Sequence, residues 1–375
     1  MRTLAVFVGA AVTLAAAPSR AGLPLLQQND PRIAAALEPI RARHKFPALG
    51  GAIVTSKGLS AMAVTGVRKA GTDVAVQPDD LWHLGSDTKA MTAAWIAKIV
   101  GSGKLTWEST IGAVMPKETA GAPDGFRNIT LLQLLSHRAG LVANINWREA
   151  SRSAATPREQ RLAAVRTAAA TKPSSAPGSK YEYSNLGYVI AAAMAEHVVD
   201  RAWEDEITAA IFDPLGMKSA GFGGLGTPGQ IDQPWPHGGD GKPVSDNGPL
   251  VDNPEVMGPA GTVHCSLADW AKFAADQLSG LEGHGALFDR ATYKRLHTAP
   301  FGGDYAFGWL AVERPWGAGT VYTHAGSNTM NFAVVWLAPL KDFAVLVTTN
   351  QGGADAQQGT DDAAAALIQL QLSTK

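Results

Sequence analysis

The sequence has a single cysteine among its 375 residues, and this scarcity excludes any intramolecular disulfide bond. Because Cys265 stands beside an expected helix start, we expect it to be a small buried hydrophobic residue rather than a nucleophile. An excess of charge is also missing, since 32 lysines and arginines oppose 33 aspartates and glutamates. The formal net charge of −1 therefore favours neither nucleic acid nor an anionic membrane surface as a partner.

Long apolar runs are missing as well. The apolar segment 4–17 is too short to cross a bilayer as a stable helix. It follows Arg2 and is followed by small residues up to Ala21, which is the order of charge, apolar region and cleavage site in an export signal. We therefore expect a signal peptide at 1–21, a mature domain at 22–375 without a transmembrane anchor, and a periplasmic or extracellular location in a bacterium.

A further absence is that of G-x-S-x-G, so nothing in the sequence supports the nucleophile elbow of an α/β-hydrolase. Nor is there support for a cofactor or a metal. The run Gly224–Gly229 matches G-x-G-x-x-G, but Pro228 would break the helix that this motif should open, so we expect a loop. His237 and Asp240 lie in a glycine-rich loop without a spaced third ligand, which argues against a metal site.

What the sequence does contain is enough apolar material for a large core, with 46% hydrophobic and 17% charged residues. Periodicity and turn residues divide the chain into strands near both ends and helices between them. We expect helices at 31–43, 86–101, 131–141, 151–172, 186–199, 266–278 and 361–372, and strands at 50–55, 59–67, 305–312, 319–323, 331–337 and 343–349.

This order predicts an α/β fold of the α+β type. An antiparallel sheet of about five or more strands would join the N-terminal hairpin to the C-terminal strands. The first and last helices would flank one face, and a large helical region would cover the other. We expect a sheet subdomain at about 25–85 and 280–375, and a helical subdomain at about 86–279.

The chemistry of the chain centres on Ser86 and Lys89, at the start of an apolar helix. Residues three apart share a helix face, so the hydroxyl and the amine would lean together. A free lysine titrates near 10.4, and keeping it neutral at pH 7 costs about 4 kcal/mol unless burial or a second cation lowers the pKa. Since a chain this long contains about one S-x-x-K by chance, the pair needs support from other motifs.

Two further motifs supply that support. Tyr183-Ser184-Asn185 forms Y-x-N, and His324-Ala325-Gly326 precedes Ser327 and an apolar strand. In this order, the three motifs resemble the serine beta-lactamase and penicillin-binding protein superfamily, and the tyrosine motif points to its class C beta-lactamase, DD-peptidase and esterase branch. The resemblance extends over roughly residues 40–350 and implies no cofactor.

The resemblance implies a role for each motif residue. Ser86 would attack an acyl carbon while Lys89 and Tyr183 accept and return the proton, in a manner the sequence leaves open. The amides of Ser86 and Ser327 would form the oxyanion hole. Asn185 would bind both the substrate and Lys89. Gly326 would let the substrate approach the strand edge.

Position 324 departs from the beta-lactamase pattern. Beta-lactamases of this branch commonly carry a lysine there, which attracts the substrate carboxylate, whereas family esterases and aminopeptidases often carry a histidine. His324 therefore favours an esterase or D-amino-acid peptidase-like hydrolase with weak or no beta-lactamase activity. His137, at the end of the expected helix 131–141, is interpreted as a structural cap that binds the last carbonyls.

Alternatives remain at this level. One is a class C-like beta-lactamase or DD-carboxypeptidase. Another is a non-catalytic protein that binds peptidoglycan fragments or a partner, although three intact motifs disfavour it. The expected ligand is a small ester, amide or beta-lactam, with peptidoglycan-derived compounds among the candidates. The sequence leaves the oligomeric state open.

Overall fold

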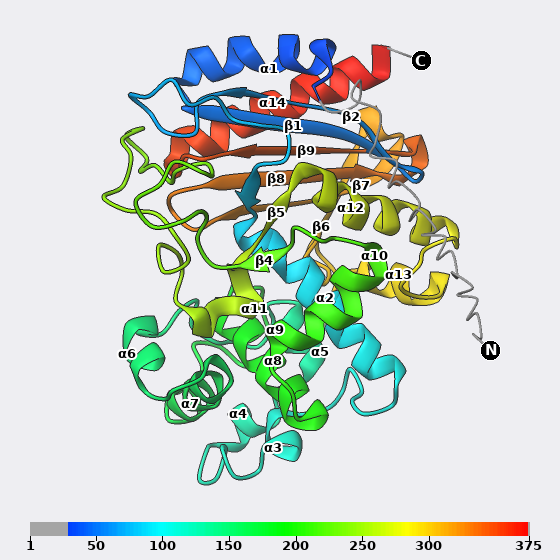
Figure 1. Ribbon diagram of the computed structural model, residues 1–375. Coiled ribbons are helices and arrows are strands. Elements are labelled where there is room, and N and C mark those ends of the chain that lie inside the picture. The colour runs from blue at the N-terminus through cyan, green and yellow to red at the C-terminus, as the bar shows by residue number, and fades with distance from the viewer. Residues whose placement is uncertain (1–28, 374–375) are drawn as a thin grey trace, which may run out of the picture.

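The computed structural model describes residues 29–373, so the expected signal peptide at 1–21 lies outside the described residues. Its centre is an antiparallel sheet of six strands in the order β2-β1-β9-β8-β7-β6 (Figure 1). The N-terminal hairpin pairs with the last strand, where Leu49 faces Thr349, which confirms that the two chain ends complete one sheet. The strands are β1 Ala48–Thr55, β2 Gly58–Gly66, β6 Leu310–Arg314, β7 Gly319–Ser327, β8 Phe332–Ala338 and β9 Phe343–Thr349.

The terminal helices α1 Pro31–His44 and α14 Gly353–Ser373 cover one face of this sheet, as expected (Figure 1). Asp30 caps α1 by accepting a hydrogen bond from the backbone of Arg32, and Pro31 occupies the first turn. The two helices approach the sheet closely at Gly51, where an added Cβ would lie 2.9 Å from the side chain of Leu367. Glycine in this strand therefore lets the helices pack tightly on the sheet.

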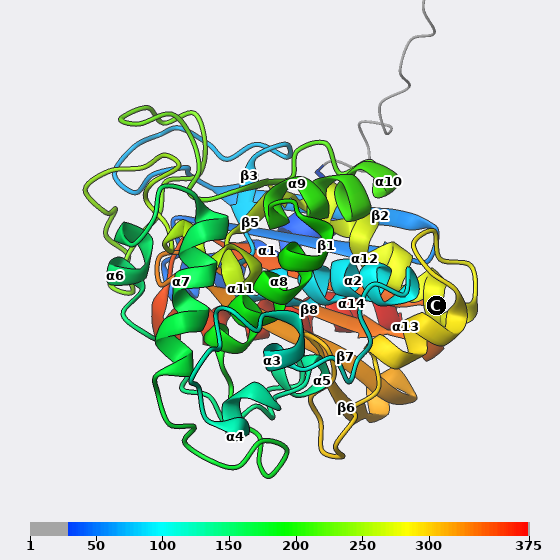
Figure 2. The same ribbon diagram turned by 90° about the horizontal axis from the view of Figure 1, so that it is seen from below.

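The opposite face is covered by α12 Leu267–Glu282 and, beneath it, by the helical region that includes α2 Thr88–Gly101 (Figures 1 and 2). Ser266 caps α12 by accepting from the amide of Asp269 at 3.2 Å. The side chains of α2 are buried on nearly every face of the helix, as its apolar composition predicts. A helix enclosed in this way holds its first turn, and thus Ser86 beside it, in a fixed position.

The helical region is built from shorter elements than the sequence predicts. The helix expected at 131–141 ends at Leu135, because His137 adopts the left-handed backbone conformation with φ 58°. The helix expected at 151–172 is two helices, because Thr156 forms a capping box with Glu159 and starts a new one. The region comprises α3 Ile111–Val114, α4 Asp124–Arg127, α5 Leu131–Leu135, α6 Trp147–Arg152, α7 Pro157–Ala169, α8 Asn185–Val199, α9 Trp203–Ile207, α10 Asp213–Leu215 and α11 Gly258–Gly261, and α13 Arg290–Leu296 follows α12.

A second sheet of three short strands was not expected. Its strands are β3 Leu81–His83, β4 Gly221–Phe222 and β5 Val263–Ser266, in the order β3-β5-β4. Such short strands carry too few residues to display a period in the sequence. The sheet matters because β3 runs directly into the turn that carries Ser86.

Two loops that the sequence singled out, 224–229 and the loop of His237, are seen in the structure. Gly224–Gly229 is a loop that no helix follows, although the two-residue β4 precedes it. His237 is buried and accepts from the backbone of Ala70 while its other nitrogen donates to the carbonyl of Asn350, so it ties loops together. Within residues 29–373, no three potential metal ligands gather, and none of the helices has the length and apolarity to cross a membrane. Cys265 is a free, buried thiol whose pKa is raised by burial.

Candidate active site

Ser86 lies in a single 3₁₀ turn, Gly85–Asp87, between β3 and α2. Two glycines, Gly85 in this turn and Gly326 in β7, allow the turn and the strand to lie in close contact. An added Cβ on Gly85, whose φ is 51°, would lie 2.2 Å from the amide nitrogen of Ser327, and one on Gly326 would lie 2.4 Å from that of Ser86. Gly326 is therefore required by the serine turn itself, which is a different reason from the substrate access expected from the sequence. The two amides assigned to an oxyanion hole are brought together by this contact.

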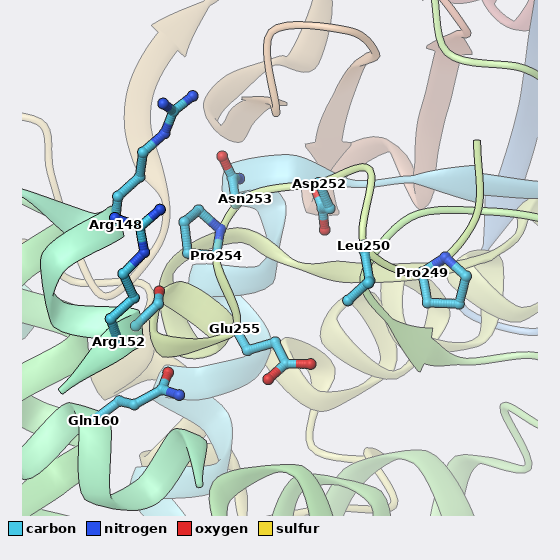
Figure 3. A pocket seen from close by; sticks show the side chains of 10 residues that line it. Arg148, Arg152, Gln160, Pro249, Leu250, Asp252, Asn253, Pro254 and Glu255 are labelled. Carbon is cyan, nitrogen blue, oxygen red and sulfur yellow. The ribbon is translucent and has the colours of Figure 1, made fainter. Parts of the chain in front are cut away.

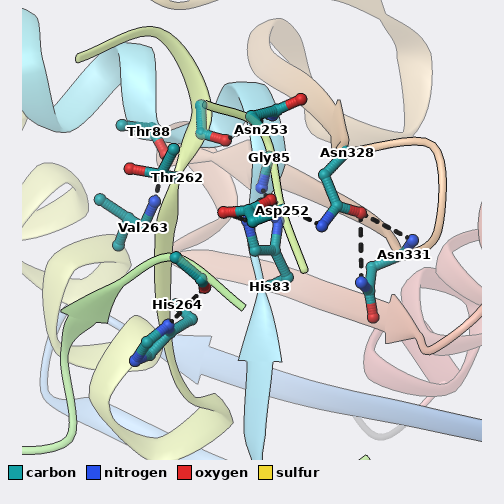
Figure 4. A network of polar contacts seen from close by, with 12 residues as sticks. His83, Gly85, Thr88, Asp252, Asn253, Thr262, Val263, His264, Asn328 and Asn331 are labelled. Carbon is teal, nitrogen blue, oxygen red and sulfur yellow. Dashed lines mark hydrogen bonds and ion pairs between the residues drawn. The ribbon is translucent and has the colours of Figure 1, made fainter. Parts of the chain in front are cut away.

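A buried network fixes the two segments that carry these amides (Figure 4). His83 accepts from the amide of Gly85 at 3.1 Å through Nδ1, so its Nε2 carries the proton and donates to Asp252 at 2.9 Å. The other carboxylate oxygen of Asp252 accepts from the side-chain amide of Asn328 at 2.8 Å. Because Gly85 precedes Ser86 and Asn328 follows Ser327, one carboxylate links the two segments that carry the amides expected to form an oxyanion hole.

Lys89 is fully buried and makes three polar contacts through Nζ. These contacts join Nζ to Oγ of Ser86 at 3.0 Å, to Oδ1 of Asn185 at 2.8 Å and to the carbonyl oxygen of Ala260 at 2.6 Å. Burial lowers the pKa of Lys89 well below its usual value, and the nearby carboxyl of Asp87 opposes this only in part. A neutral amine has two N–H bonds and one lone pair. The side-chain carbonyl of Asn185 and the backbone carbonyl of Ala260 can only accept, so they take the two N–H bonds. The lone pair is thus left to accept the hydroxyl proton of Ser86.

Tyr183 reaches the same hydroxyl from the other side. Its Oη lies 2.9 Å from Oγ of Ser86. Burial raises the pKa of Tyr183, and the hydrogen bond to Ser86 offsets this only in part, so the phenol keeps its proton. Tyr183 then donates to Ser86 while Ser86 donates to Lys89. Of the two groups that the sequence offers as bases, the structure favours the lysine.

His137 holds Tyr183 in place. The ring of His137 lies 4.3 Å from the ring of Tyr183 between centroids, and its Nδ1 accepts from the amide of Ser184 at 3.1 Å. Its own carbonyl accepts from the amide of Glu182 at 2.8 Å. His137 therefore binds the residues on both sides of Tyr183, which corrects the expectation of a cap for the last helical carbonyls. Burial lowers the pKa of His137 well below its usual value, consistent with a neutral ring.

Asn185 connects the site to the helical region. While its Oδ1 accepts from Lys89, its Nδ2 donates to Oδ1 of Asn144 at 2.9 Å, and that oxygen also accepts from the indole of Trp147. Trp147 begins α6, which carries Arg148 and Arg152 along one wall of a pocket of about 410 Å³ (Figure 3). The opposite wall of this pocket includes Asn253, whose side chain donates to the carbonyl of Gly261.

His324 lies on β7 but contacts neither Lys89 nor Tyr183 in the hydrogen-bond network. Its Nδ1 is 3.4 Å from Oδ1 of Asp87, and its Nε2 is 3.2 Å from Oη of Tyr305. Burial and the nearby Lys89 lower the pKa of His324 to about 3. The histidine is thus neutral at the pH of most enzymes, and it offers no cation to a substrate or to Tyr183.

The edge of β7 is open beside the serine. β6 pairs with β7 only as far as Leu310 and Thr323, so His324–Ser327 has no strand partner on that side. The strand expected at 305–312 is interrupted because Gly308, with φ 84°, turns the chain onto α2, where an added Cβ would lie 2.4 Å from the amide of Ala90. Ala325 is exposed on this edge. The open edge offers backbone groups to an extended substrate.

The structure thus brings together every residue that the sequence assigned to the site. Ser86, Lys89, Tyr183 and Asn185 form one hydrogen-bonded cluster, and Gly326 and Ser327 lie against the serine turn. Sequence reasoning missed Asp87, Tyr305 and the carbonyl of Ala260. Asp87 carried a usable signal, since an acidic residue between a serine and a lysine on a buried helix needs a partner. The other two carried none, because Tyr305 lies outside the three motifs and a backbone carbonyl has no sequence signature.

Comparison with known proteins agrees with this geometry. A family model described as beta-lactamase matches residues 33–370, which is most of the chain. The chain belongs to the beta-lactamase family. As a member of this family with hydrolases and penicillin-binding proteins among its relatives, it is a serine hydrolase. The resemblance noted in the sequence is confirmed.

Individual relatives are distant. Penicillin-binding protein 4 of Amycolatopsis lactamdurans is 24% identical over 338 residues, which cover 84% of each chain. The structure of a D-alanine carboxypeptidase AmpC from Burkholderia cenocepacia superposes with a TM-score of 0.70 at 18% identity, over 90% of this chain and 98% of that one. The structure of SurE with D-Leu gives a TM-score of 0.71 at 21% identity, over 90% and 74%. At these identities the two structures establish the fold alone.

Proposed function

We propose that this protein is an exported serine hydrolase that forms an acyl-enzyme on Ser86, with an ester or a D-amino-acid peptide as substrate and weak or no beta-lactamase activity. The observation that carries the proposal is the double contact of the Ser86 hydroxyl with Lys89 Nζ at 3.0 Å and Tyr183 Oη at 2.9 Å. A buried amine with a lowered pKa is a competent base for a serine hydroxyl.

The proposed reaction begins when Oγ of Ser86 attacks the substrate carbonyl carbon and passes its proton to Nζ of Lys89. The carbonyl oxygen becomes an oxyanion, which the amides of Ser86 and Ser327 stabilise by roughly 3 to 4 kcal/mol per donor. When the carbon–oxygen or carbon–nitrogen bond breaks, the leaving group takes a proton from the Lys89–Tyr183 pair. Water then attacks the acyl-enzyme, gives up a proton along the same route, and frees Ser86.

The substrate class follows from the charge of the site. A neutral His324 gives no cation for a carboxylate, and this favours neutral acyl donors over beta-lactams. The open edge of β7 suits a peptide or an extended ester. The similarity in fold to SurE with D-Leu and to a D-alanine carboxypeptidase supports D-amino-acid peptides as candidates. A class C-like beta-lactamase or DD-carboxypeptidase remains the alternative, and a non-catalytic binder is disfavoured by the complete cluster.

The decisive experiment is covalent labelling of the purified mature protein. A fluorophosphonate probe should add mass to the peptide that contains Ser86 and should fail to label Ser86→Ala. A panel of chromogenic esters, nitrocefin and D-alanyl peptides then ranks the substrates. Label on another serine would reject the assignment, and nitrocefin as the best substrate would favour the beta-lactamase alternative.

The roles of Lys89 and Tyr183 have their own test. Lys89→Ala and Tyr183→Phe should each slow acylation by about 10²-fold or more, because each removes a proton-transfer partner of Ser86. Their combined loss should be smaller than the product of the single losses, since the two groups act as a unit. Multiplicative losses would argue for independent roles.

Export is proposed on the sequence of residues 1–21, which has the order of charge, apolar region and small residues of an export signal. Sequencing the N-terminus of the protein recovered from a bacterial periplasm should give a start near Gly22. A protein that stays in the cytoplasm with Met1 intact would reject this part of the proposal.

A further inference from the structure

A second cavity lies on the His324 side of the candidate active site. It has a volume of about 250 Å³ and is lined by Arg138, Tyr181, Gly302, Gly303, Asp304, Tyr305 and Leu310. None of these residues has a role in the proposed reaction. The cavity is therefore a feature of this chain that the proposed reaction has not used.

Aromatic contacts place the cavity one layer of side chains away from the serine. The ring of Tyr181 lies 5.5 Å from that of Tyr305, and Tyr305 lies 4.5 Å from His137, which itself packs on Tyr183. On the other side, Oη of Tyr305 contacts His324 at 3.2 Å. The wall of the cavity is thus continuous with the groups that hold Tyr183 and His324.

The cavity also lies at the point where the edge of β7 opens. Leu310, in its wall, is the first residue of β6 and pairs with Thr323, the residue before His324. A substrate that lies along the open edge from Ser327 toward Thr323 therefore meets Leu310 and Tyr305 next. The geometry gives the cavity a role in binding whatever part of the substrate extends in this direction.

The apolar part of the cavity wall comes from Tyr181, Tyr305 and Leu310. Seven large apolar side chains are exposed by more than a third within residues 29–373, and Tyr181 and Leu310 of this cavity are among them at 43% and 37%. A third, Phe301, directly precedes the cavity residue Gly302. Exposed apolar groups gathered in a concave surface beside a reactive centre are typical of a ligand site. Charge is confined to Arg138 and Asp304, and Nη2 of Arg138 donates to the carbonyl of Gly302 at 3.4 Å.

We propose that the cavity between Tyr181, Tyr305 and Leu310 is a specificity subsite that binds an apolar side group of the substrate, such as a benzyl or branched aliphatic group. The inference rests on the proposed hydrolase function, and it adds the class of substrate that the enzyme prefers. The apolar group can belong to the acyl part or to the leaving group, and the experiment below separates these two sources.

The test uses three esters, compared in two pairs. Ethyl acetate and ethyl 3-phenylpropionate differ by a phenyl-bearing acyl chain, and ethyl acetate and 2-phenylethyl acetate differ by a phenyl-bearing alcohol. In the wild-type protein, kcat/KM should rise at least tenfold with the phenyl group in one of the two pairs, because burial of an apolar group in a fitted pocket gives discrimination of this order. The pair that responds identifies the source of the group.

Variants locate the effect. Leu310→Trp fills the cavity and should reduce the phenyl preference to about twofold or less, and Tyr181→Ala should reduce it severalfold. Leu340→Trp is the matched control, since Leu340 is 69% exposed in the turn between β8 and β9, and it should keep the wild-type ratio. Equal ratios in wild type, Leu310→Trp and Leu340→Trp, or no phenyl preference in either pair, would overturn the proposal.

A second readout separates the subsite from the ester hydrolysis. Two fluorophosphonates are compared, one with an ethyl tail and one with a phenylpropyl tail. In wild type the phenylpropyl probe should label Ser86 at least tenfold faster than the ethyl probe. In Leu310→Trp the two probes should label Ser86 at about the same rate. Turnover of ethyl acetate without a phenyl effect retains the hydrolase and rejects the subsite. A phenyl-dependent labelling rate without ester turnover retains the subsite and rejects ester hydrolysis, and no labelling at all rejects both.

Discussion

Oδ1 of Asp87 lies 3.4 Å from Nδ1 of His324, and both side chains are almost completely buried, with 2% and 5% of their surface exposed. Neither oxygen of the Asp87 carboxyl accepts a hydrogen bond from another group. Burial raises the pKa of Asp87 well above its usual value and lowers that of His324, so both groups are held in their neutral forms. The residue next to the serine is thus in contact with His324, the position at which the sequence departs from the common beta-lactamase pattern.

This contact predicts how the enzyme responds to a cation at position 324. In His324→Lys the new ammonium would lie beside Asp87, whose carboxyl would ionise and pair with it. The preference for a carboxylate-bearing beta-lactam over a neutral p-nitrophenyl ester should then change by less than about threefold. In the double variant Asp87→Asn/His324→Lys the ammonium is free, and the preference should rise about tenfold.

Acylation rates of both substrates at pH 7 measure this preference, and Asp87→Asn alone is the control. If His324→Lys raised the preference as much as the double variant does, Asp87 would not restrain the cation. If neither raised it, position 324 would not select on substrate charge.

The buried amine of Lys89 predicts a pH dependence of stability. Its pKa is lowered in the folded state, so between that value and about 10.4 the unfolded chain binds a proton that the folded protein does not. The free energy of unfolding therefore rises with pH through this window, by up to about 1.4 kcal/mol per pH unit. The contribution is complete above the unfolded pKa and is lost progressively as the pH falls through the window to the folded pKa. Lys89→Met should remove the contribution.

Urea unfolding of wild type and Lys89→Met between pH 7 and 8.5 checks this, because other titrating groups are common to both proteins and cancel in the difference. Lys57→Met, at an exposed hairpin position, should follow the wild type. Parallel stability curves for wild type and Lys89→Met would show that Lys89 stays protonated in the folded protein.

His137 should act as a positioning residue for Tyr183. His137→Ala removes both the ring that packs on Tyr183 and the acceptor for the amide of Ser184. We expect kcat for a small ester to fall by about 10²-fold, because a small displacement of a proton donor is costly, while KM changes little. His137→Asn retains an acceptor for the amide of Ser184. It should recover at least a third of the loss in log kcat. An Asn variant as slow as the Ala variant would leave only a packing role.

Gly326 should be intolerant of a methyl group. A Cβ at this position would lie 2.0 Å from the carbonyl oxygen of Leu84 and 2.4 Å from the amide of Ser86, both backbone atoms that cannot move aside freely. Gly326→Ala should therefore lower the stability by about 2 kcal/mol and acylation of Ser86 by about 10²-fold. Gly101→Ala is the control, since nothing lies within 4 Å of its added Cβ. Normal acylation in Gly326→Ala would show that the serine turn does not depend on this close contact.

The sequence alone predicts an element correctly where the residues that define the element are neighbours in the chain. The bounds of β9 coincide with the expected strand at 343–349, and α1 ends one residue beyond the expected 43. In both, the residues that define the element are neighbours, with a regular apolar period and a recognisable cap or turn. The same holds for Ser86 and Lys89, although the helix expected from residue 86 begins at Thr88: the 3₁₀ turn of Ser86 runs directly into α2, and three positions along this continuous turn bring the two side chains together.

Tertiary structure decided how these residues behave. Lys89 is proposed as the base because Ala260 and Asn185, from distant parts of the chain, accept the N–H bonds of its buried amine. His324 is neutral and turned toward Asp87 because β7 packs on the serine turn through two glycines. The protonation state of a side chain depends on its burial and on charged and hydrogen-bonding partners from many segments. The residue pattern of one segment carries no information about these partners. The sequence by itself therefore determined which side chains are present at the site, and only the packing of distant segments decided which of them holds the proton.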